Sequence, residues 1–364
     1  MDEGKKREAV VNPIPVPTWN WLKMNEAVVR TDAQPDGEIR PAVSGVGSGI
    51  IYRAAPAAPF SGATGLGGGA SVFFADAGKN GVALTAERDA RNSAPVVLSY
   101  DWKDGGSAAC TQIVRAEENS SLTVIVVSRS PRDAAGFSAM RTKLCAARNA
   151  HIHLVKVQLL GGGFVQLDDT SAVCSDGGTV EVTHVILGGA ETYVGVAAAL
   201  SGFQSSFSSD TAYLCSGGQL LDMNYIVTHT GKRTSSSMAV DGTLCGRARK
   251  TYRGTIDFQN GCSGAVGEEQ EEVLLLSPDA VNKSIPLILC GEEDVSGEHG
   301  ATIGRLSEEM LFYMQARGIG RQAAERLVAR AKIQRALSRI PDEGTAAAVQ
   351  QCLDGAFGDH EPLL

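Results

Sequence analysis

Short segments rich in β-branched residues recur along the middle of the chain, and a glycine follows most of them. Segments of this kind, bounded by Gly, Asp, Asn and Ser, are typical of β-strands and their turns. No helical periodicity interrupts them over about 200 residues. The segments are 95–100, 122–128, 152–160, 179–187, 220–230, 251–258 and 273–276, and the glycines that divide them, mostly 11 to 16 residues apart, are Gly161, Gly177, Gly188, Gly202, Gly217, Gly231 and Gly242.

The repeated strand and turn predict a mainly β fold, and we expect a right-handed parallel β-helix over residues 95–296. An immunoglobulin-like sandwich or a barrel is the alternative, because regular strand spacing alone suits either. Antiparallel hairpins favour Asn-Gly turns, and the chain has such pairs only at 80–81 and 260–261. Residues 1–94 are expected to form a separate, irregular lead-in segment, since the proline-rich stretch 12–23 must be extended.

The carboxy-terminal part, residues 297–364, is predicted to be a helical domain. Ser307 is the expected N-cap of a first helix, because its hydroxyl can accept a bond from a free N–H of the first turn. Gly318 is the expected end, since glycine adopts the left-handed cap conformation without strain. A second helix is expected over 321–337, where apolar residues recur three and four positions apart, and Pro341 ends it. The last residues show little periodicity, so we expect them to fray.

Composition excludes several classes of function. A net charge of −8 argues against general nucleic-acid binding, which needs a basic surface. No apolar run approaches the roughly 20 residues that cross a bilayer, so we expect a cytoplasmic protein without membrane association. The eight cysteines fit that compartment as free, buried thiols. The glycines within 65–69 lack the preceding strand of a dinucleotide site, and no G-x-x-x-x-G-K-[ST] phosphate loop is present.

Two stretches mark the change from strand to helix. They are Glu-His-Gly-Ala-Thr at 298–302 and Leu-Phe-Tyr-Met-Gln-Ala-Arg-Gly-Ile at 311–319. Both resemble the SufB/SufD family, the scaffold proteins of the Suf iron–sulfur cluster assembly machinery, and the SufD branch is the closer match. The stretch Trp-Asn-Trp-Leu-Lys at 19–23 is also similar to the entry of some members of that branch. The resemblance implies the same β-helix fold and a non-catalytic scaffold subunit that pairs with a SufB-like paralogue.

The resemblance also implies that the helical tail binds a SufC-type ABC ATPase, which would supply any nucleotide chemistry. The second predicted helix is strongly basic, and a solvated face is the ordinary interpretation of such a pattern. An interaction surface is the alternative that the family favours. The residues that we assign to partner binding are Phe312, Gln315, Arg317, Gly318, Ile319 and Arg321.

His299 is the residue that the resemblance assigns to iron or cluster handling, at a position facing a SufB-like partner. One imidazole is too few for a metal, because clusters and tetrahedral metals need about four ligands. Glu298 would point to the opposite face of a continuing strand. The other ligands must then come from a second chain, so any iron or iron–sulfur cluster would be transient and shared, with no intrinsic cofactor. Without the resemblance, His299 would be interpreted as a polar residue at a domain junction.

Two positions depart from the family pattern. Members of the SufD branch often carry a cysteine two residues before this histidine, where this chain has Gly297. The SufB branch carries a cysteine at the position of Ala280, which favours a SufD-like role. Cys290, at the end of the intervening strand, is a substitute candidate ligand. Whether the assembly is a homodimer or a heteromer stays open.

Four other histidines are possible ligands. His151 and His153 share one face of an expected strand and could form half of a metal site. His184 and His229 lie on otherwise apolar faces, and ordinary structural histidines are the favoured interpretation of all four.

A carbohydrate-active β-helix, either a lyase or a glycosidase, is the alternative function. Such an enzyme needs two carboxylates aimed at one bond, whereas Asp168 and Asp169 would point to opposite faces of a strand. A self-associating structural β-solenoid is the third hypothesis.

Overall fold

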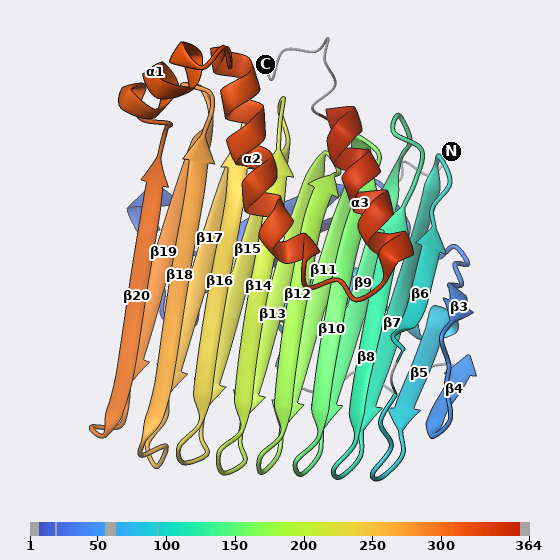
Figure 1. Cartoon of the computed structure of the whole chain (residues 1–364). Helices are drawn as coiled ribbons and strands as arrows, with labels where there is room; N and C mark the ends of the chain where they lie inside the picture. Colours follow the sequence, from blue (N-terminus) through green and yellow to red (C-terminus); the bar gives the residue numbers. More distant parts are fainter. Residues whose placement is uncertain (1–6, 19, 55–62, 93, 357–364) are drawn as a thin grey trace.

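The computed structural model describes residues 7–18, 20–54, 63–92 and 94–356. Two stacked nine-stranded sheets form the body, and from β5 onward successive strands fall alternately in the two sheets, so that the chain coils (Figure 1). Within each sheet the coil strands pair in parallel, as β10 does with β8 and β12. The predicted parallel β-helix is therefore confirmed, and the sandwich and barrel alternatives are wrong. Trp19, from the tryptophan-containing stretch 19–23, lies outside the described residues.

We call the two layers the even sheet and the odd sheet. In spatial order, the even sheet contains β20 (Val295–Gly304), β18 (Ala265–Leu275), β16 (Ser235–Leu244), β14 (Ser206–Cys215), β12 (Thr179–Gly188), β10 (His151–Leu160), β8 (Ser121–Arg129), β6 (Val96–Asp101) and β3 (Ala42–Ser44). The odd sheet contains β19 (Val281–Cys290), β17 (Arg249–Phe258), β15 (Leu220–His229), β13 (Glu191–Leu200), β11 (Gly163–Cys174), β9 (Ala135–Ala146), β7 (Gly106–Ala116), β5 (Gly81–Ala86) and β4 (Ile50–Ala54).

Equivalent residues of successive coils form straight rows. Val124 pairs with Leu154, and Leu154 pairs with Val182 in the next coil. Since side chains alternate along a strand, each row faces either the interior or the outside. The row of Val124, Leu154 and Val182 faces inward, is buried, and belongs to the main hydrophobic core between the two sheets. The register therefore decides which side chains of this chain share an environment.

Strands occupy more of the chain than the pattern of β-branched segments predicted. β5 already pairs in parallel with β7, inside the stretch 1–94 that was expected to be irregular. β20 continues through Gly304, beyond the expected boundary at residue 296. The serine-rich segments β14 and β16, which are not among the predicted strands, are full strands. Each of them pairs with a neighbour on both sides, and this pairing outweighs a weak intrinsic β propensity.

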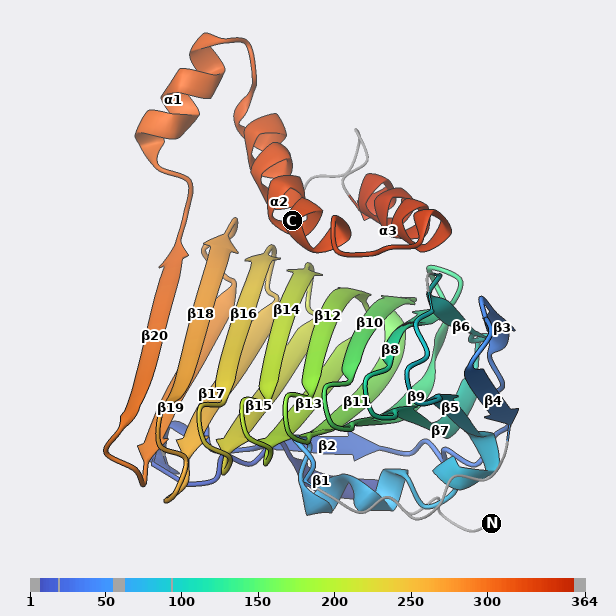
Figure 2. The same cartoon turned by 60° about the horizontal axis from the view of Figure 1, so that its bottom comes forward.

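A strap formed by the described residues before β5, apart from β3 and β4, covers the outer face of the odd sheet (Figure 2). Its hairpin pairs β1 (Arg7–Val11) with β2 (Ala27–Thr31), and its short turns are η1 (Asn20–Leu22), η2 (Gly68–Phe73) and η3 (Ala77–Asn80). Phe73 and Leu66 of the strap pack on Phe137 and Leu167 of the coil in a second hydrophobic cluster. The strap closes an apolar face that would otherwise contact water.

Buried polar contacts anchor the strap. Asn12 donates to Asp222 over 2.7 Å, and Arg253 donates to the same carboxylate over 2.6 Å. Arg253 also donates to the backbone carbonyl of Met24 over 2.7 Å. A Cβ on Gly195 would lie 2.0 Å from the backbone nitrogen of Leu66, so the strap touches the coil where a side chain is absent.

Three helices follow the coil: α1 (Glu308–Ala316), α2 (Arg321–Leu337) and α3 (Glu343–Ala356). The predicted caps are confirmed, because Ser307 accepts from the backbone N–H of Met310 and Gly318 has a φ of +84°. The expectation that the last residues fray is wrong for α3. Its Val349 and Leu353 are buried in a third hydrophobic cluster on the outer face of the even sheet.

The basic face of α2 is bound to the coil. Lys332 lies 3.0 Å from Glu272, and Arg335 lies 3.3 Å from Asp241. Both α2 and α3 lie across the even sheet (Figure 1), whereas α1 extends away from it (Figure 2). The charges of α2 are thus mostly used within the chain. In the described ranges, no helix is long and apolar enough to span a membrane.

Candidate functional site

The two ends of the coil are built differently. At one end, the short strands β3 and β4 pair antiparallel with β6 and β5 and so terminate both sheets. At the other end, β20 and β19 are the outermost strands of the even and odd sheets, and no further strand of the described chain adjoins them (Figure 1). Most residues of β20 are exposed. We call β19, β20 and the inward-facing residues beneath them the open end.

His299 lies on the inward side of β20. A Cβ on Gly297 would lie 3.0 Å from side-chain atoms of Ile288 and Phe258, so this position faces the interior between the sheets. His299, two residues further along β20, shares that orientation. In the strand register His299 is opposite Glu269 of β18. His299 therefore lies next to Glu269 of the preceding coil, on the same inward face of the even sheet. Glu298 faces outward, as predicted.

Glu269 is a buried carboxylate at the base of the open end. Only 4% of the residue is exposed, and its carboxylate packs against Gly254 of the opposite sheet, where a Cβ would lie 2.3 Å from Oε1. Burial raises the pKa of Glu269 to about 7, while Lys250 and Tyr252 act in the opposite direction. The Tyr252 hydroxyl lies beside this carboxylate and interacts with it, although the contact has poor hydrogen-bond geometry.

An ion pair lies beside this carboxylate. Lys250 donates to Glu271, and it also donates to Asn282 of β19 over 3.1 Å. Burial lowers the pKa of Lys250 well below its ordinary value, and Glu269 opposes that shift. Asn282 in turn donates to Ser284 over 3.2 Å. The floor and rim of the open end are therefore polar, although a coil interior is normally filled with apolar side chains.

The open end does not bring Cys290 and His299 together. Gly297 faces Ile288, and the two strands run in opposite directions across the interior. Cys290 lies two residues beyond Ile288 toward the turn, while His299 lies two residues beyond Gly297 away from it. At about 3.3 Å per residue, roughly 13 Å separates them along the strands. Cys290 is exposed, so one metal ion could not bridge these two residues of the same chain.

The other histidines have ordinary partners. His151 Nε2 lies 3.2 Å from Glu181, and His153 Nε2 lies 3.0 Å from the Thr183 hydroxyl. His229 is bonded to Thr234 and Ser236, and burial lowers its pKa to about 4. No group of three His, Cys, Asp or Glu residues that could hold a metal occurs in the described part of the chain.

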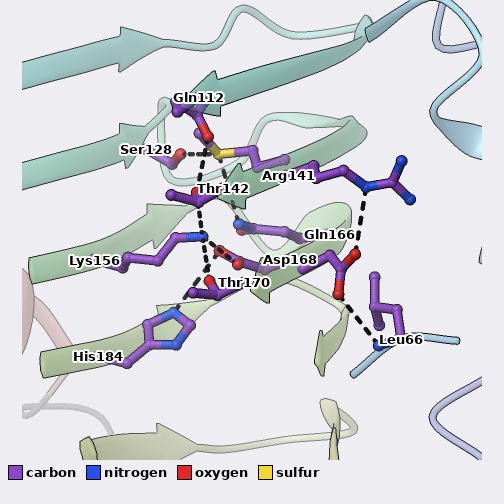
Figure 3. A network of polar contacts seen from close by, with 12 residues as sticks. Leu66, Gln112, Ser128, Arg141, Thr142, Lys156, Gln166, Asp168, Thr170 and His184 are labelled. Carbon is purple, nitrogen blue, oxygen red and sulfur yellow. Dashed lines mark hydrogen bonds and ion pairs between the residues drawn. The ribbon is translucent and has the colours of Figure 1, made fainter. Parts of the chain in front are cut away.

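A second polar network lies inside the coil (Figure 3). Lys156 of β10 donates to Asp168 of β11, and Thr142 donates to Gln112 over 2.9 Å. His184 Nε2 lies 4.0 Å from Asp168, and burial lowers the pKa of His184 to about 4. Asp169 points to the other face, where Thr64 of the strap donates to it over 2.6 Å. Asp168 and Asp169 therefore do not form a pair of carboxylates aimed at one bond.

Sequence reasoning missed Lys250, Glu269 and Glu271. The run Gly-Glu-Glu-Gln-Glu-Glu at 267–272 reads as a solvated acidic stretch. On β18, however, burial alternates along the run, so that Glu269 and Glu271 face inward and Glu268 and Glu272 face outward. The alternation of inward and outward side chains along a strand was the one signal that the sequence offered. Without the strand register, nothing in the sequence identified which carboxylates are inside.

The first helix of the tail presents an apolar surface. Phe312 is 73% exposed and Tyr313 is 57% exposed, and the guanidinium of Arg317 lies 4.6 Å from the Tyr313 ring. Arg321 pairs with Glu308 over 3.1 Å. Of the residues assigned to partner binding, Phe312, Gln315, Arg317, Gly318 and Arg321 are exposed and Ile319 is half-buried.

Comparison with known proteins fits this architecture. The family model described as "SUF system FeS cluster assembly, SufBD core domain" matches residues 102–332, more than half of the chain. The chain belongs to the SufBD family. The family match covers the coil from the start of β7, together with α1 and most of α2.

Curated relatives agree with the family. The iron–sulfur cluster assembly protein SufD of Bacillus subtilis is 24% identical over 269 residues, which cover 72% of this chain and 61% of that protein. SufD of Escherichia coli is 23% identical and covers 62% of this chain and 54% of its own length. A chloroplastic SufBD family protein of Arabidopsis thaliana, ABCI8, is 26% identical over 54% of this chain and 36% of its own length. The matches thus span about three fifths or less of these relatives.

Proposed function

We propose that this SufBD protein is a SufD-like, non-catalytic scaffold subunit of a cytoplasmic Suf assembly complex. It pairs with a SufB-like subunit through its open end and docks a SufC-type ATPase through α1. Iron, or an iron–sulfur cluster under assembly, is the cargo that both paired subunits hold. The observation that carries the proposal is the open end, where β19 and β20 each leave one sheet edge without a partner strand among the described residues, and where His299 lies.

Pairing follows from the edges of β19 and β20. Each edge strand is ten residues long and presents unpaired backbone N–H and C=O groups, which readily extend a sheet with strands of another chain. Solenoids need a cap at each end to shield their interior. β3 and β4 supply one at the first end. A second β-helix would supply the other, and a second copy of this chain is the alternative partner.

The cargo role follows from counting donors. His299 offers one imidazole, and imidazole is a suitable ligand for iron. A complete coordination shell needs donors from the partner, which explains a shared and transient site. The carbohydrate-enzyme alternative has no comparable support, since Asp168 and Asp169 occupy opposite faces of β11.

Docking of an ATPase on α1 follows from its exposed apolar surface. Met310, Phe312 and Tyr313 are large, exposed side chains on a helix that extends away from the coil (Figure 2). Aromatic residues clustered in this way are typical of protein interfaces. Because α2 and α3 cover the even sheet, removing the whole tail would also expose the coil. Point changes on α1 therefore give the cleaner test.

The test is co-expression of this chain with SufB-like and SufC-type proteins, followed by co-purification and anaerobic cluster reconstitution. Ile303→Asp at the open end should abolish pairing, and Val266→Asp, an equally exposed change on the outer face of β18, should leave pairing intact. Phe312→Ala with Tyr313→Ala should remove the ATPase and retain the SufB-like subunit. His299→Ala should reduce iron and sulfide content at unchanged stoichiometry. Equal cluster loading in the wild-type and His299→Ala complexes would refute the cargo role.

A further inference from the structure

The connection between the two strands of the strap hairpin carries exposed apolar side chains. Trp21, in η1, is 79% exposed, and Val16 and Leu22 are 44% and 37% exposed. An exposed cluster of large apolar side chains commonly marks a binding surface. Tryptophan is also among the residues that contribute most to binding energy in protein interfaces. We call the described residues between 14 and 24 the strap tip.

The strap tip reaches the open end of the coil. Arg253 of β17 donates to the backbone carbonyl of Met24 over 2.7 Å, and β17 is the neighbour of the edge strand β19. Ile285 of β19 is opposite Arg253 in the register and shares its outward orientation, yet it is only 2% exposed. The cover therefore extends to the last coil, and Figure 2 shows the blue loop of the hairpin beneath β17 and β19. Trp21, three residues from Met24, lies within about 11 Å of it.

The strap tip is held in a defined conformation. The backbone N–H of Ile14 donates to the Asn25 carbonyl over 2.9 Å and so closes the loop. Asn224 of β15 donates to the carbonyl of Pro13 over 3.1 Å. Lys23 adopts a left-handed conformation, with a φ of +52°. A pre-organised segment loses little conformational freedom when it binds. The exposed indole of Trp21 is thus presented on a rigid support.

The end face of the coil is smaller than a stable interface needs. Each edge strand has ten residues and is about 33 Å long, and two sheets about 10 Å apart give a face of roughly 700 Å² when their side chains are included. A stable interface buries about 800 Å² on each partner. A buried tryptophan side chain contributes roughly 150–250 Å². The strap tip would bring the surface beside the open end to the required size.

We propose that the strap tip is a second part of the contact with the SufB-like subunit, and that Trp21 is its anchor. This inference rests on the proposed pairing through the open end and adds to it a contact outside the coil. A coil that stacks end to end on this one places its own flank in line with the strap tip. The surface that fits the indole is therefore an apolar strip on the flank of the partner's terminal coil.

Binding of the full chain to the purified SufB-like subunit, measured by isothermal titration calorimetry, tests the role of Trp21. Trp21→Ala should weaken binding about 30-fold, the scale on which loss of an interface tryptophan acts. Trp21→Phe should recover most of the affinity, because it restores an aromatic ring. Phe203→Ala is the matched control, since Phe203 is a 47% exposed aromatic residue between β13 and β14, away from the open end. Its affinity should stay within about twofold of the wild type.

Two further readouts separate an interface role from a structural one. Pairing should shift the fluorescence emission of the wild type to shorter wavelength as Trp21 leaves water, and the shift should be smaller for Trp21→Phe. The Tm of the unpaired Trp21→Ala chain should lie within about 1 °C of the wild type, because changes at exposed positions alter stability by about 0.5 kcal/mol or less. A lower Tm with an unchanged emission shift would show that Trp21 supports the strap and not the interface.

The outcomes distinguish this inference from the proposed function. If Trp21→Ala binds the SufB-like subunit as tightly as Phe203→Ala does, the strap tip is no part of the interface, while Ile303→Asp still decides the proposed pairing. If Trp21→Ala instead loses only the ATPase, or only self-association of this chain, the strap tip contacts a different partner and the inference is refuted. If Ile303→Asp pairs as the wild type does, the proposed pairing fails and the inference fails with it.

Discussion

Replacing Arg253 by methionine should destabilise the protein by several kcal/mol. Arg253 is 1% exposed, and it joins Asp222 of the coil to the Met24 carbonyl of the strap. Methionine keeps much of the side-chain volume and removes the charge. Asp222 is then left fully buried with one remaining side-chain donor, the Asn12 amide at 2.7 Å. Breaking a buried ion pair from one side typically costs about 3–5 kcal/mol, because the other charge stays buried without compensation.

That cost can be converted into a shift in Tm. The unfolding entropy is about 2.1 cal/mol/K per residue, or roughly 0.8 kcal/mol/K for this chain of 364 residues. A loss of about 4 kcal/mol therefore lowers Tm by about 5 °C. Because Arg253 is a main anchor of the strap, residues between Arg7 and Thr31 should also become sensitive to protease at temperatures below Tm.

The pH dependence gives this prediction a specific sign. Burial raises the pKa of Asp222, and Arg253 and Asn12 oppose the shift. Without Arg253 the pKa rises further, so the folded variant keeps a proton that the unfolded chain, with a pKa of about 3.9, has released. Stability then decreases as pH rises between those two pKa values. The deficit of Arg253→Met relative to the wild type should be smaller near pH 5 than near pH 8.

Differential scanning calorimetry at both pH values, with limited proteolysis, measures these effects. Arg249→Met makes the same change at an exposed position of the same strand and serves as the control. Its stability should stay within about 0.5 kcal/mol of the wild type. An Arg253→Met protein as stable as that control, or one whose deficit grows on acidification, would contradict the reasoning.

Three further predictions concern the coil and its coverings. Gly195→Ala places a Cβ 2.0 Å from the Leu66 nitrogen and should displace the strap, lowering Tm and exposing the strap to protease; a Tm equal to that of the wild type would show that the contact is not tight. Burial lowers the pKa of His184 and of His229 to about 4. Between pH 7 and pH 4 the unfolded chain takes up a proton on each histidine that the folded chain does not, so the folded state loses up to about 3 kcal/mol of stability per histidine. His184→Gln should therefore flatten the dependence of the denaturation midpoint on pH. Val349→Asp should detach α3 from the even sheet and increase binding of a hydrophobic dye, whereas Gln351→Asp on its exposed side should not.

The open end shows how much residue patterns can predict without the strand register. The family motif identified His299, and the alternation of side chains along a strand predicted that Glu298 faces away from it. It could not identify Glu269, because 30 residues separate the two in sequence and only the pairing of β18 with β20 places them together. The acidic run around Glu269 looks uniformly solvated until the strand divides it between two faces. Which charges lie inside is thus a property of the coil.

Local chemistry and tertiary packing determined different parts of this protein. Glycine turns and β-branched runs predicted the β-helix, and Ser307 and Gly318 predicted the limits of α1, because these signals act within a few residues. The tertiary structure alone decided that serine-rich β14 and β16 are strands, that α3 is ordered, and that the basic face of α2 is bound to the even sheet. In each of these cases the stabilising partner comes from a distant coil or helix, and no local pattern encodes a contact whose other half lies so far along the chain.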